Sequence, residues 1–371
     1  MTLQDTKLPH TAATRAVPTG KTGGPARVCV VGGAGYVGSV LTRILLARGY
    51  GVTVLDTFLY DHAFSVECVY DEPGYRLVTG DLRDASVVAD ALNDADHVVL
   101  LASLVGDPIS KKYPELTRSV NLDGSQALYD ALDAFGIERF VFTSTCSNYG
   151  LREDSSLADE GSELNPLSLY AETKVGFERY VLSRLHQQQV TPTLLRIATA
   201  FGMSPRMRFD LTVNEFGRAM ALGQPLDVYD KDTWRPYAHV RDIASAIITV
   251  LEAPAAKVAG EVFNVGSDAN NYTKAMLVEE FARHVDAPVR FVEKGFDARN
   301  YRVSFSKIRT QLGFEAQHSV AAFVPQLIAA VRDGLYGRVE NIEGYYGNYT
   351  VRDGVPETIA ITEQRREPVS A

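Results

Sequence analysis

The chain has 371 residues, of which 46% are hydrophobic, and a formal net charge of -9. This is enough to bury the core of one large globular domain or of one and a half, whereas the acidic charge argues against a nucleic-acid-binding protein. The three cysteines, Cys29, Cys68 and Cys146, are odd in number and lack metal-ligand spacing. They favour a reducing cytoplasm and predict neither disulfides nor a metal site. The longest apolar stretches, such as residues 97–105, are shorter than the roughly 20 residues of a membrane helix, so no membrane partner is expected.

Strands and helices are predicted to alternate along the first two thirds of the chain. Residues 1–26 are rich in Thr, Pro, Gly and Ala, without the apolar run of a signal peptide, and are expected to form a flexible tail. From Arg27 onward, short β-branched runs alternate with helical segments, which is typical of parallel βαβ units. Strands are expected at residues 27–31, 51–56, just before Asp81, and at 96–103, 138–145, 191–200 and 260–266. The pattern predicts an α/β fold with a doubly wound parallel sheet of the Rossmann type, covered by helices on both faces.

A smaller, discontinuous substrate domain is expected in the second half of the chain. After Ala200 the alternation gives way to a loop-rich stretch that carries arginines and then to helical periodicity. We assign the dinucleotide-binding domain to residues 27–202, with 235–266 returning to it, and the substrate domain to residues 203–234 and 267–337. Residues 338–371 are polar and are expected to form a peripheral C-terminal tail.

A glycine-rich turn follows the first predicted strand and precedes a helix. Gly32, Gly35 and Gly38 are spaced so that the first allows a tight turn, the second admits a pyrophosphate and the third lets the helix pack on the strand. The amides at the helix N-terminus then face the phosphate charge. Such a pattern also occurs at ordinary tight turns, so the following strand is needed to interpret it.

Two aspartates follow the second and third predicted strands. Asp56 ends the run VTVLD about 20 residues beyond the glycines, where an acidic side chain binds the adenosine ribose diol and repels a 2′-phosphate. The preferred cofactor is therefore NAD rather than NADP. Asp81 lies where it could accept a hydrogen bond from the adenine amino group, and it could equally cap the next helix.

A tyrosine and a lysine four residues apart are the candidate catalytic pair. Tyr170 and Lys174 lie in a segment of helical character, so both project from one face. The lysine ammonium and an oxidised nicotinamide would lower the pKa of the phenol from about 10, so that tyrosinate can act as a base. Hydroxyl groups at the end of the fifth strand, among them Thr145 and Ser147, could share the substrate proton, although most of them are expected only to cap and turn the chain.

The order of the motifs resembles that of a known family. GGAGYVGS, VLD, GDL, VVLLAS, VNLDGS, STCSNYG, YAETK and RPYAHVRD occur as in the nucleotide-sugar epimerases and dehydratases of the extended short-chain dehydrogenase/reductases, over about residues 27–335. The resemblance implies that Thr145 is the conserved hydroxyl, that Tyr170 is the base and that Lys174 contacts the nicotinamide ribose. Asn121 would steady the active-site helix. The implied NAD-binding residues also include Gly32, Gly35, Tyr36, Val37, Gly38, Asp56, Asp81, Leu82, Leu101, Ala102 and Ser103.

The residues after Thr145 bear on the type of reaction. The 4,6-dehydratases of the group carry Asp-Glu there, whereas this chain has Cys146 and Ser147. Without that glutamate, epimerisation at C4 through a transient 4-keto intermediate is the leading hypothesis. Dehydration or C3/C5 epimerisation using Cys146 remains an alternative, although a free cysteine is more often buried filler. A nucleotide-sugar ketoreductase or dehydrogenase is a further alternative, whereas a binding protein without chemistry is disfavoured because Tyr170 and Lys174 are both present.

The expected substrate is a nucleotide-diphosphate sugar. By resemblance, Arg235 and Arg302 would contact its diphosphate. Arg206 and Arg208 are more readily interpreted as solvated loop charges than as ligand-binding residues, and Arg208 is included in the candidate substrate-binding set. Thr199, which replaces an asparagine of the family pattern, and Asn214 complete the predicted substrate-binding set.

Two predicted helices suggest a homodimer. The segments 121–135 and 168–185 resemble helices that form a four-helix bundle across a two-fold axis in this family. Each has an apolar stripe wider than a single contact with the sheet needs.

Overall fold

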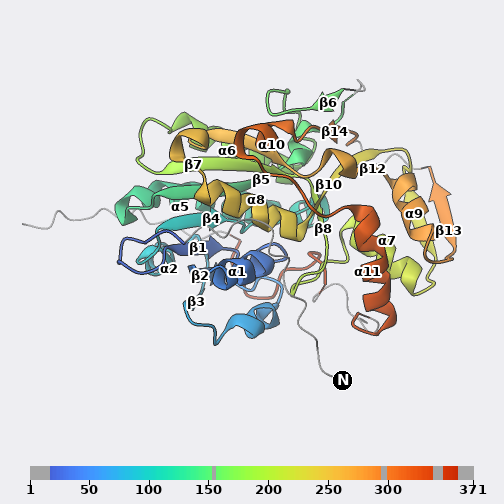
Figure 1. Ribbon diagram of the computed structural model, residues 1–371, viewed down its shortest axis with the longest axis horizontal. Coiled ribbons are helices and arrows are strands. Elements are labelled where there is room, and N and C mark those ends of the chain that lie inside the picture. Colours follow the sequence, from blue (N-terminus) through green and yellow to red (C-terminus); the bar gives the residue numbers. More distant parts are fainter. Residues whose placement is uncertain (1–16, 153–155, 294–298, 337–345, 358–371) are drawn as a thin grey trace, which may run out of the picture.

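The computed structural model describes residues 17–152, 156–293, 299–336 and 346–357 and has a seven-stranded parallel sheet at its centre (Figure 1). The strand order is β11-β7-β5-β4-β1-β2-β3. The strands are β1 (Arg27–Val31), β2 (Gly51–Asp56), β3 (Tyr75–Thr79), β4 (His97–Leu100), β5 (Arg139–Thr145), β7 (Thr191–Ile197) and β11 (Glu261–Val265). All seven predicted strands lie in this sheet, so the predicted doubly wound Rossmann architecture is confirmed.

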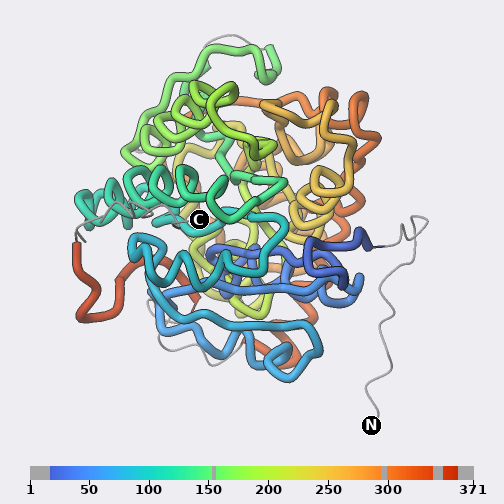
Figure 2. Tube along the Cα trace, turned by 90° about the vertical axis from the view of Figure 1, so that its left-hand side faces the viewer, coloured from blue at the N-terminus to red at the C-terminus, as the bar shows by residue number. Residues whose placement is uncertain are grey.

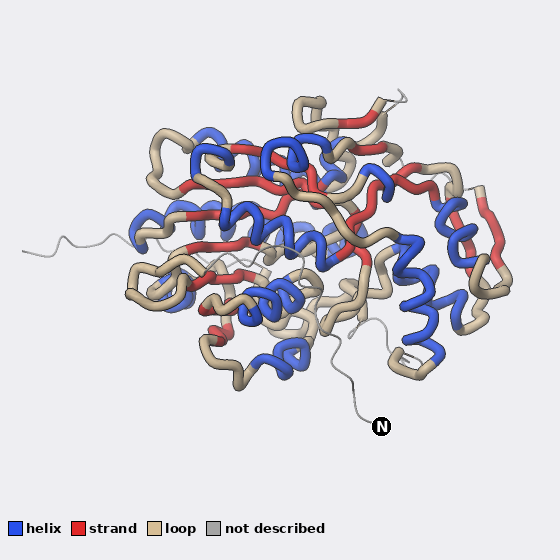
Figure 3. The backbone as a smooth tube through the Cα atoms, viewed as in Figure 1, coloured by secondary structure: helices blue, strands red, loops and turns tan. Residues whose placement is uncertain are grey.

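Helices cover both faces of the sheet, as Figure 3 shows with the strands as a layer between helices. The helices are α1 (Gly38–Ala47) and α8 (Val240–Glu252) on one face, and α2 (Ala85–Leu92), α3 (Asp107–Lys112), α4 (Pro114–Arg118), α5 (Ser125–Ala131) and α6 (Leu169–Ser183) on the other. Side chains alternate along β1, so that Val28 and Val30 join the core cluster under α1 and α8. Cys29 and Val31 join the cluster under α2, α5 and α6. Apolar residues on both faces explain why this strand is a continuous hydrophobic run.

The order of the strands reverses at β1. Val31 pairs with Leu55 of β2 on one side and with Leu100 of β4 on the other. Successive connections run outward in opposite directions from this point, so the loops beyond β1 and β4 separate and leave a crevice at the carboxyl edge of the sheet.

Most of the remaining elements gather beyond that edge, on the right in Figure 1, whereas α10 (Ser306–Leu312) packs against β11 of the sheet. The helices α7 (Thr212–Ala221), α9 (Lys274–Ala282) and α11 (Val320–Arg332) pack on one another. A small sheet consists of β8 (Thr199–Phe201), β10 (Trp234–His239) and β12 (Asn271–Thr273). Two further strand pairs are β9 (Leu226–Tyr229) with β13 (Val289–Val292), and β6 (Leu157–Ala158) with β14 (Arg302–Val303). The division into a dinucleotide-binding and a substrate domain stays a prediction.

Parts of both expected tails are packed against the body. The backbone N–H of Lys21 donates to the Asp96 carboxylate at 2.7 Å. At the other end, the N–H of Phe209 donates to the carbonyl of Tyr346 at 2.7 Å, and Val351 is only 7% exposed. Residues 17–26 and 346–357 therefore differ from free tails, because backbone hydrogen bonds and apolar burial hold them. The rest of the two expected tails lies outside the described residues.

No helix of the described residues is both long and apolar enough to span a bilayer.

Gly38 is the position where the turn after β1 and the first helix approach most closely. A Cβ at residue 38 would meet the carbonyl oxygen of Gly32 and would lie 2.7 Å from Gly33 Cα. We expect Gly38→Ala to lower the free energy of unfolding by about 1–3 kcal/mol, because the backbone must shift to relieve the overlap. Gly24→Ala, which meets nothing within 4 Å, is the matched control. Equal losses for the two variants in urea unfolding would contradict the assignment.

Candidate active site

A cavity of about 430 Å³ lies at the carboxyl edge of the sheet, between the strand ends and the outer elements. Of the predicted site residues, its lining includes Gly32, Gly35, Tyr36, Val37, Gly38, Asp56, Asp81, Leu82, Leu101, Ala102, Ser103, Thr145, Ser147, Tyr170, Lys174, Thr199, Arg208 and Arg235. Asn121, Cys146, Asn214 and Arg302 are not part of the lining. The structure thus brings residues at the ends of β1, β2 and β5 and on α6 together with Arg235 of β10, which follows Gly32 by 203 positions.

The glycine-rich turn forms one wall of the cavity. Gly32 has a φ of +86°, and a Cβ there would lie 2.8 Å from the Cα of Ala102. Only glycine fits this combination of a left-handed backbone and a close neighbouring strand end. The turn leads into α1, whose N-terminal amides are suited to an anionic group.

Asp56 is the last residue of β2, and hydrogen bonds within the protein hold its carboxylate in place. Its Oδ2 accepts the N–H of Ala34 at 3.0 Å and its Oδ1 that of Phe58 at 2.8 Å. His62 Nε2 lies 3.5 Å from Oδ1. Burial raises the pKa of Asp56, but the hydrogen bond and charge of His62 and the two backbone N–H groups outweigh it, so the pKa is lowered overall. The side chain is therefore a fixed anion at the position expected for a ribose diol.

Asp81 has a partner that the sequence interpretation missed. Its carboxylate accepts hydrogen bonds from the Arg83 guanidinium, at 3.0 Å from Nε and 2.7 Å from Nη2. The alternative that Asp81 caps a helix is wrong, because the N-cap of α2 is Asp84, which accepts from the N–H groups of Ser86 and Val87. A contact of Asp81 with adenine stays a prediction.

The candidate catalytic residues meet where β5 and α6 approach each other. Ser168 caps α6, so Tyr170 lies in the first turn and Lys174 one turn later. Lys174 Nζ donates to the carbonyl of Thr143 at 2.9 Å. Thr145 ends β5, its hydroxyl accepts the N–H of Ser147 at 3.1 Å, and its side chain lowers the pKa of the Tyr170 phenol. The hydroxyl group thus both caps a turn and faces the candidate base.

Burial dominates the protonation of this pair in the protein alone. It raises the pKa of Tyr170 to about 12, although the hydrogen bond from Thr145 and the charge of Arg208 lower it. Burial also lowers the pKa of Lys174 to about 7, against the opposing effect of Glu178. The expected lowering of the phenol pKa by Lys174 is therefore not found, because desolvation is the larger effect.

A buried polar network holds α6 against the sheet behind the catalytic residues. Glu178, two turns after Tyr170, forms an ion pair with Arg196 of β7 at 2.8 Å. The carboxylate also accepts from the Ser144 hydroxyl and, at 2.9 Å, from Asn148 Nδ2. The network fixes the helix that carries Tyr170 to the strand that carries Thr145.

Cys146 points away from the cavity. It is 1% exposed, and its Sγ donates to the carbonyl of Arg196 at 3.2 Å. Burial raises the pKa of the thiol, so a reactive thiolate is disfavoured. Its predicted catalytic role is not supported by this geometry, whereas Ser147 lines the cavity.

The two predicted asparagines act within the protein. The side chain of Asn121 accepts a hydrogen bond from the N–H of Leu104 and donates one to the carbonyl of the same residue. It also donates to the hydroxyl of Thr173 in α6 at 3.3 Å. Asn214 accepts from the N–H of Gly202 at 3.2 Å and donates to the hydroxyl of Tyr36 at 3.0 Å. Asn214 therefore supports the glycine-rich turn and does not face the cavity, which corrects its assignment to the substrate.

Arginines surround the opposite wall of the cavity. Arg235 lines the cavity and donates hydrogen bonds to the carbonyls of Trp234, at 2.8 Å, and of Arg299. Arg302 is not part of the lining, and its guanidinium lies 5.1 Å from the centre of the Trp234 ring. The interpretation of Arg206 and Arg208 as solvated loop charges is wrong, since both are buried and line the cavity. Their segment folds inward because Arg208 pairs with Asp210 at 2.5 Å.

Several lining residues were missed by the sequence interpretation. They are His62, Arg83, Asp107, Arg206, Lys274, Arg299, Asn348, Tyr349 and Val355. The basic character of residues 203–208 was visible, but no periodic pattern indicated which charges turn inward. Within the part of the chain that the structure describes, no group of three or more His, Cys, Asp or Glu could hold a metal ion.

Comparison with known proteins identifies the family. The model of the NAD dependent epimerase/dehydratase family matches residues 28–266. The chain belongs to this family, and its cofactor is NAD. It is 32% identical over 301 residues to the low-salt glycan biosynthesis protein Agl12 of Haloferax volcanii, covering 79% of this chain and 94% of that protein.

Two further relatives represent different reactions of the family. The chain is 26% identical over 312 residues to a UDP-glucose 4-epimerase of Lactobacillus helveticus, covering 79% of this chain and 92% of the epimerase. Among solved structures, DesIV, a dTDP-glucose 4,6-dehydratase of Streptomyces venezuelae with NAD and TYD bound, is 28% identical with a TM-score of 0.73, over 83% of this chain and 97% of that chain. Resemblance alone therefore leaves the type of reaction open.

The ordered carboxylate of Asp56 predicts the choice of cofactor. We expect NAD to bind at least about tenfold more tightly than NADP, because the fixed anion repels a 2′-phosphate; tenfold corresponds to ~1.4 kcal/mol. Asp56→Ala should remove the preference in calorimetric titrations. Asp71→Ala, which removes an exposed carboxylate from the same half of the molecule, should retain it. Equal affinities of the unmodified protein for the two cofactors would exclude the assignment.

Proposed function

We propose that this protein is a nucleotide-sugar 4-epimerase that acts through a transient 4-keto intermediate. The observation that carries the proposal is the division of roles after β5. Thr145 and Tyr170 both line the cavity and Thr145 lowers the pKa of the phenol, whereas Cys146 is buried and bonded to the carbonyl of Arg196. The side chains that oxidation and reduction at one carbon require are present, and the thiol that an additional proton transfer would use is turned away.

The roles of the chain's residues follow from their positions. NAD, when bound, accepts a hydride from the sugar and returns it, and its oxidised ring adds a positive charge beside the phenol. That charge favours the Tyr170 phenolate, which then takes the C4 hydroxyl proton while Thr145 holds the same oxygen. Lys174, bonded to the carbonyl of Thr143, has its ammonium fixed beside the phenol ring. Tyr170 returns the proton when the keto-sugar is reduced from its other face.

The basic wall of the cavity supports a diphosphate substrate. Arg208, Arg235, Arg299 and Lys274 all line it in a chain whose net charge is -9. Guanidinium groups bind phosphate oxygens in a bidentate manner, which suits the diphosphate of a sugar nucleotide. The names of the two relatives, UDP-glucose 4-epimerase and dTDP-glucose 4,6-dehydratase, specify substrates of this kind.

One carboxylate favours a second candidate reaction. Asp107 lines the cavity and raises the pKa of Tyr170 through its charge. Its Oδ1 is buried and makes no hydrogen bond with the described residues, while its Oδ2 lies 3.5 Å from Arg299. A carboxylate in this position could remove a proton from a carbon next to the keto group, as C3/C5 epimerisation or dehydration requires.

Substitutions of the catalytic residues test the main proposal. Tyr170→Phe removes the oxygen that takes the proton but keeps the ring, so turnover should fall by about 10²–10⁴-fold with folding and NAD binding retained. Thr145→Ala should cost less, because it deletes only a supporting hydrogen bond. Cys146→Ser should keep most activity. Turnover is followed by separating the epimeric sugar nucleotides, and undiminished turnover of Tyr170→Phe would refute its role as the base.

Reaction in deuterated water separates the candidate reactions. C4 epimerisation moves hydride internally, so every ring carbon of the product should be free of solvent deuterium. Deuterium at C3, C5 or C6, lost in Asp107→Asn or in Cys146→Ala, would identify the base of the alternative reaction and overturn the C4 assignment. A stoichiometric change of free NADH absorbance during turnover would instead indicate a ketoreductase or dehydrogenase.

We also propose a homodimer formed through α5 and α6. These helices pack side by side on one face of the sheet, and their predicted apolar stripes motivate the interface. Light scattering at micromolar concentration should give twice the mass of the chain. A monomeric mass at that concentration would contradict the proposal.

A further inference from the structure

A segment far from the family motifs forms part of the cofactor cavity. Residues 346–357, here called the C-terminal strap, place Asn348, Tyr349 and Val355 in the lining that also contains the glycine-rich turn and Asp56. Figure 2 shows the strap in red, along the outer edge of the blue and teal half of the molecule. The position of the C-terminal strap in the cavity wall therefore differs from that of the peripheral tail predicted from the sequence.

The first part of the strap is attached to the elements outside the Rossmann sheet. The N–H of Phe209 donates to the carbonyl of Tyr346 at 2.7 Å. Arg206 Nη2 donates to the carbonyl of Gly347 and to Asn348 Oδ1, both at 3.1 Å. The N–H of Asn348 donates to Asp210 at 3.3 Å. Three consecutive strap residues are thus bonded to the segment 206–210.

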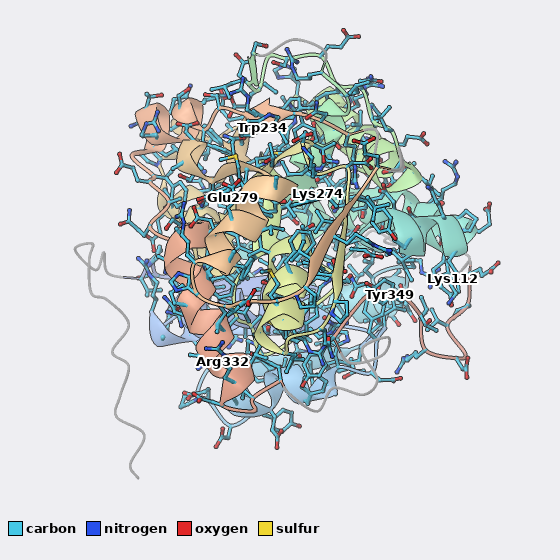
Figure 4. The ribbon with its side chains drawn as sticks, turned by 90° about the vertical axis from the view of Figure 1, so that its right-hand side faces the viewer. Lys112, Trp234, Lys274, Glu279, Arg332 and Tyr349 are labelled. Carbon is cyan, nitrogen blue, oxygen red and sulfur yellow. The ribbon has the colours of Figure 1, made fainter. Side chains whose placement is uncertain are left out.

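The rest of the strap is attached to the Rossmann half. Lys112 of α3 donates to the carbonyl of Tyr349 at 3.3 Å and to the hydroxyl of Thr350 at 3.0 Å, and Figure 4 shows Lys112 and Tyr349 close together. The N–H of Arg352 donates to the carbonyl of Leu59 at 3.0 Å. Arg83 donates to the carbonyls of Pro356, at 3.0 Å, and Glu357, at 2.9 Å. Val351 is buried in the core cluster under α2, α5 and α6.

These attachments locate the strap over the adenosine half of the cofactor. Leu59 follows Asp56 by three residues beyond β2, and Arg83 follows Asp81 by two residues beyond β3. In a doubly wound sheet the ends of these strands hold the adenosine ribose and base. Thr145 ends β5 and Tyr170 lies on α6, and none of the hydrogen bonds of the strap described above involves either residue.

Arg206 links the strap to the expected position of the diphosphate. It is 1% exposed, forms no ion pair with the described residues, and its Nε has no hydrogen-bond partner among them. Its own N–H is bonded to Ser204, whose hydroxyl donates to the carbonyl of Tyr36 in the glycine-rich turn at 2.7 Å. A buried cation without a counter-charge is costly, and a dinucleotide diphosphate beside this turn would supply one.

We propose that the C-terminal strap is a binding element for NAD. It forms the outer wall of the adenosine half of the site, and Arg206 joins the strap carbonyls to the cofactor diphosphate. NAD leaves only when the strap lifts, so one cofactor molecule remains bound through many turnovers. Substrate and product exchange at the Tyr170 end of the cavity without moving the strap.

The test measures cofactor release from the full-length holoprotein. The protein is loaded with NADH and mixed with excess NAD, and the decay of bound NADH fluorescence gives the dissociation rate. Val351→Asp forces a charge into the buried position and should expel the strap, raising this rate at least about tenfold. Lys112→Ala should raise it several-fold, whereas Lys111→Ala, which removes the adjacent exposed lysine, should leave it unchanged. Val285→Asp places the same charge in a buried site outside the cavity lining and should also leave the rate unchanged.

Each outcome decides the proposal. Release at the unmodified rate in both Val351→Asp and Lys112→Ala, with thermal unfolding showing an intact core, would overturn it. Equal acceleration by Val285→Asp and Val351→Asp would do the same, because general loosening would then explain the effect. If Val351→Asp does not fold, the difference between Lys112→Ala and Lys111→Ala decides. The release experiment contains no sugar nucleotide, so its result is independent of the proposed epimerase reaction.

Discussion

The ion pair between Glu178 and Arg196 is the interaction on which the active-site geometry depends. It is almost completely buried and joins α6 to β7, with Ser144 and Asn148 completing the coordination of the carboxylate. Removing one partner of such a pair leaves an uncompensated charge and costs about 3–5 kcal/mol. Tyr170 and Lys174 lie on the same helix, two turns and one turn before Glu178 respectively, so their approach to Thr145 depends on this attachment. The chemistry uses oxygen atoms that line the cavity, whereas their positions are set by a buried ion pair outside its lining.

An acidic protein has here concentrated positive charge in its cleft. Arg206, Arg208, Arg235, Arg299 and Lys274 line one wall, although carboxylates outnumber cations over the chain as a whole. Low-dielectric surroundings strengthen the attraction of these groups for a bound anion. The fixed Asp56 anion lines the same cavity, so anionic and cationic groups both border it. The attraction of the cavity for anionic ligands therefore depends on where the charged side chains lie and not on the net charge of the chain.

The fold and the motif residues could be predicted from the sequence because they rest on local patterns. The seven strands are continuous β-branched runs, and the glycines, Asp56, Tyr170 and Lys174 occupy fixed places relative to those runs. Arg206 and Arg208 were misjudged because their burial depends on Asp210 and on residues 346–348, and no sequence pattern connects these segments. Cys146 was ambiguous for a similar reason: a residue just after a strand can face either the cavity or the core, and only packing against Arg196 decides.

Arg83 has a consequence for how this protein can change over evolution. One guanidinium serves both Asp81, just beyond β3, and the carbonyls of Pro356 and Glu357. A substitution at position 81 therefore alters the attachment of the strap, and loss of the strap removes two carbonyl acceptors from Arg83. Across relatives, positions 81, 83 and the strap should be inherited or lost as a unit, so an ancestor that acquired the strap also constrained the cofactor site beneath it.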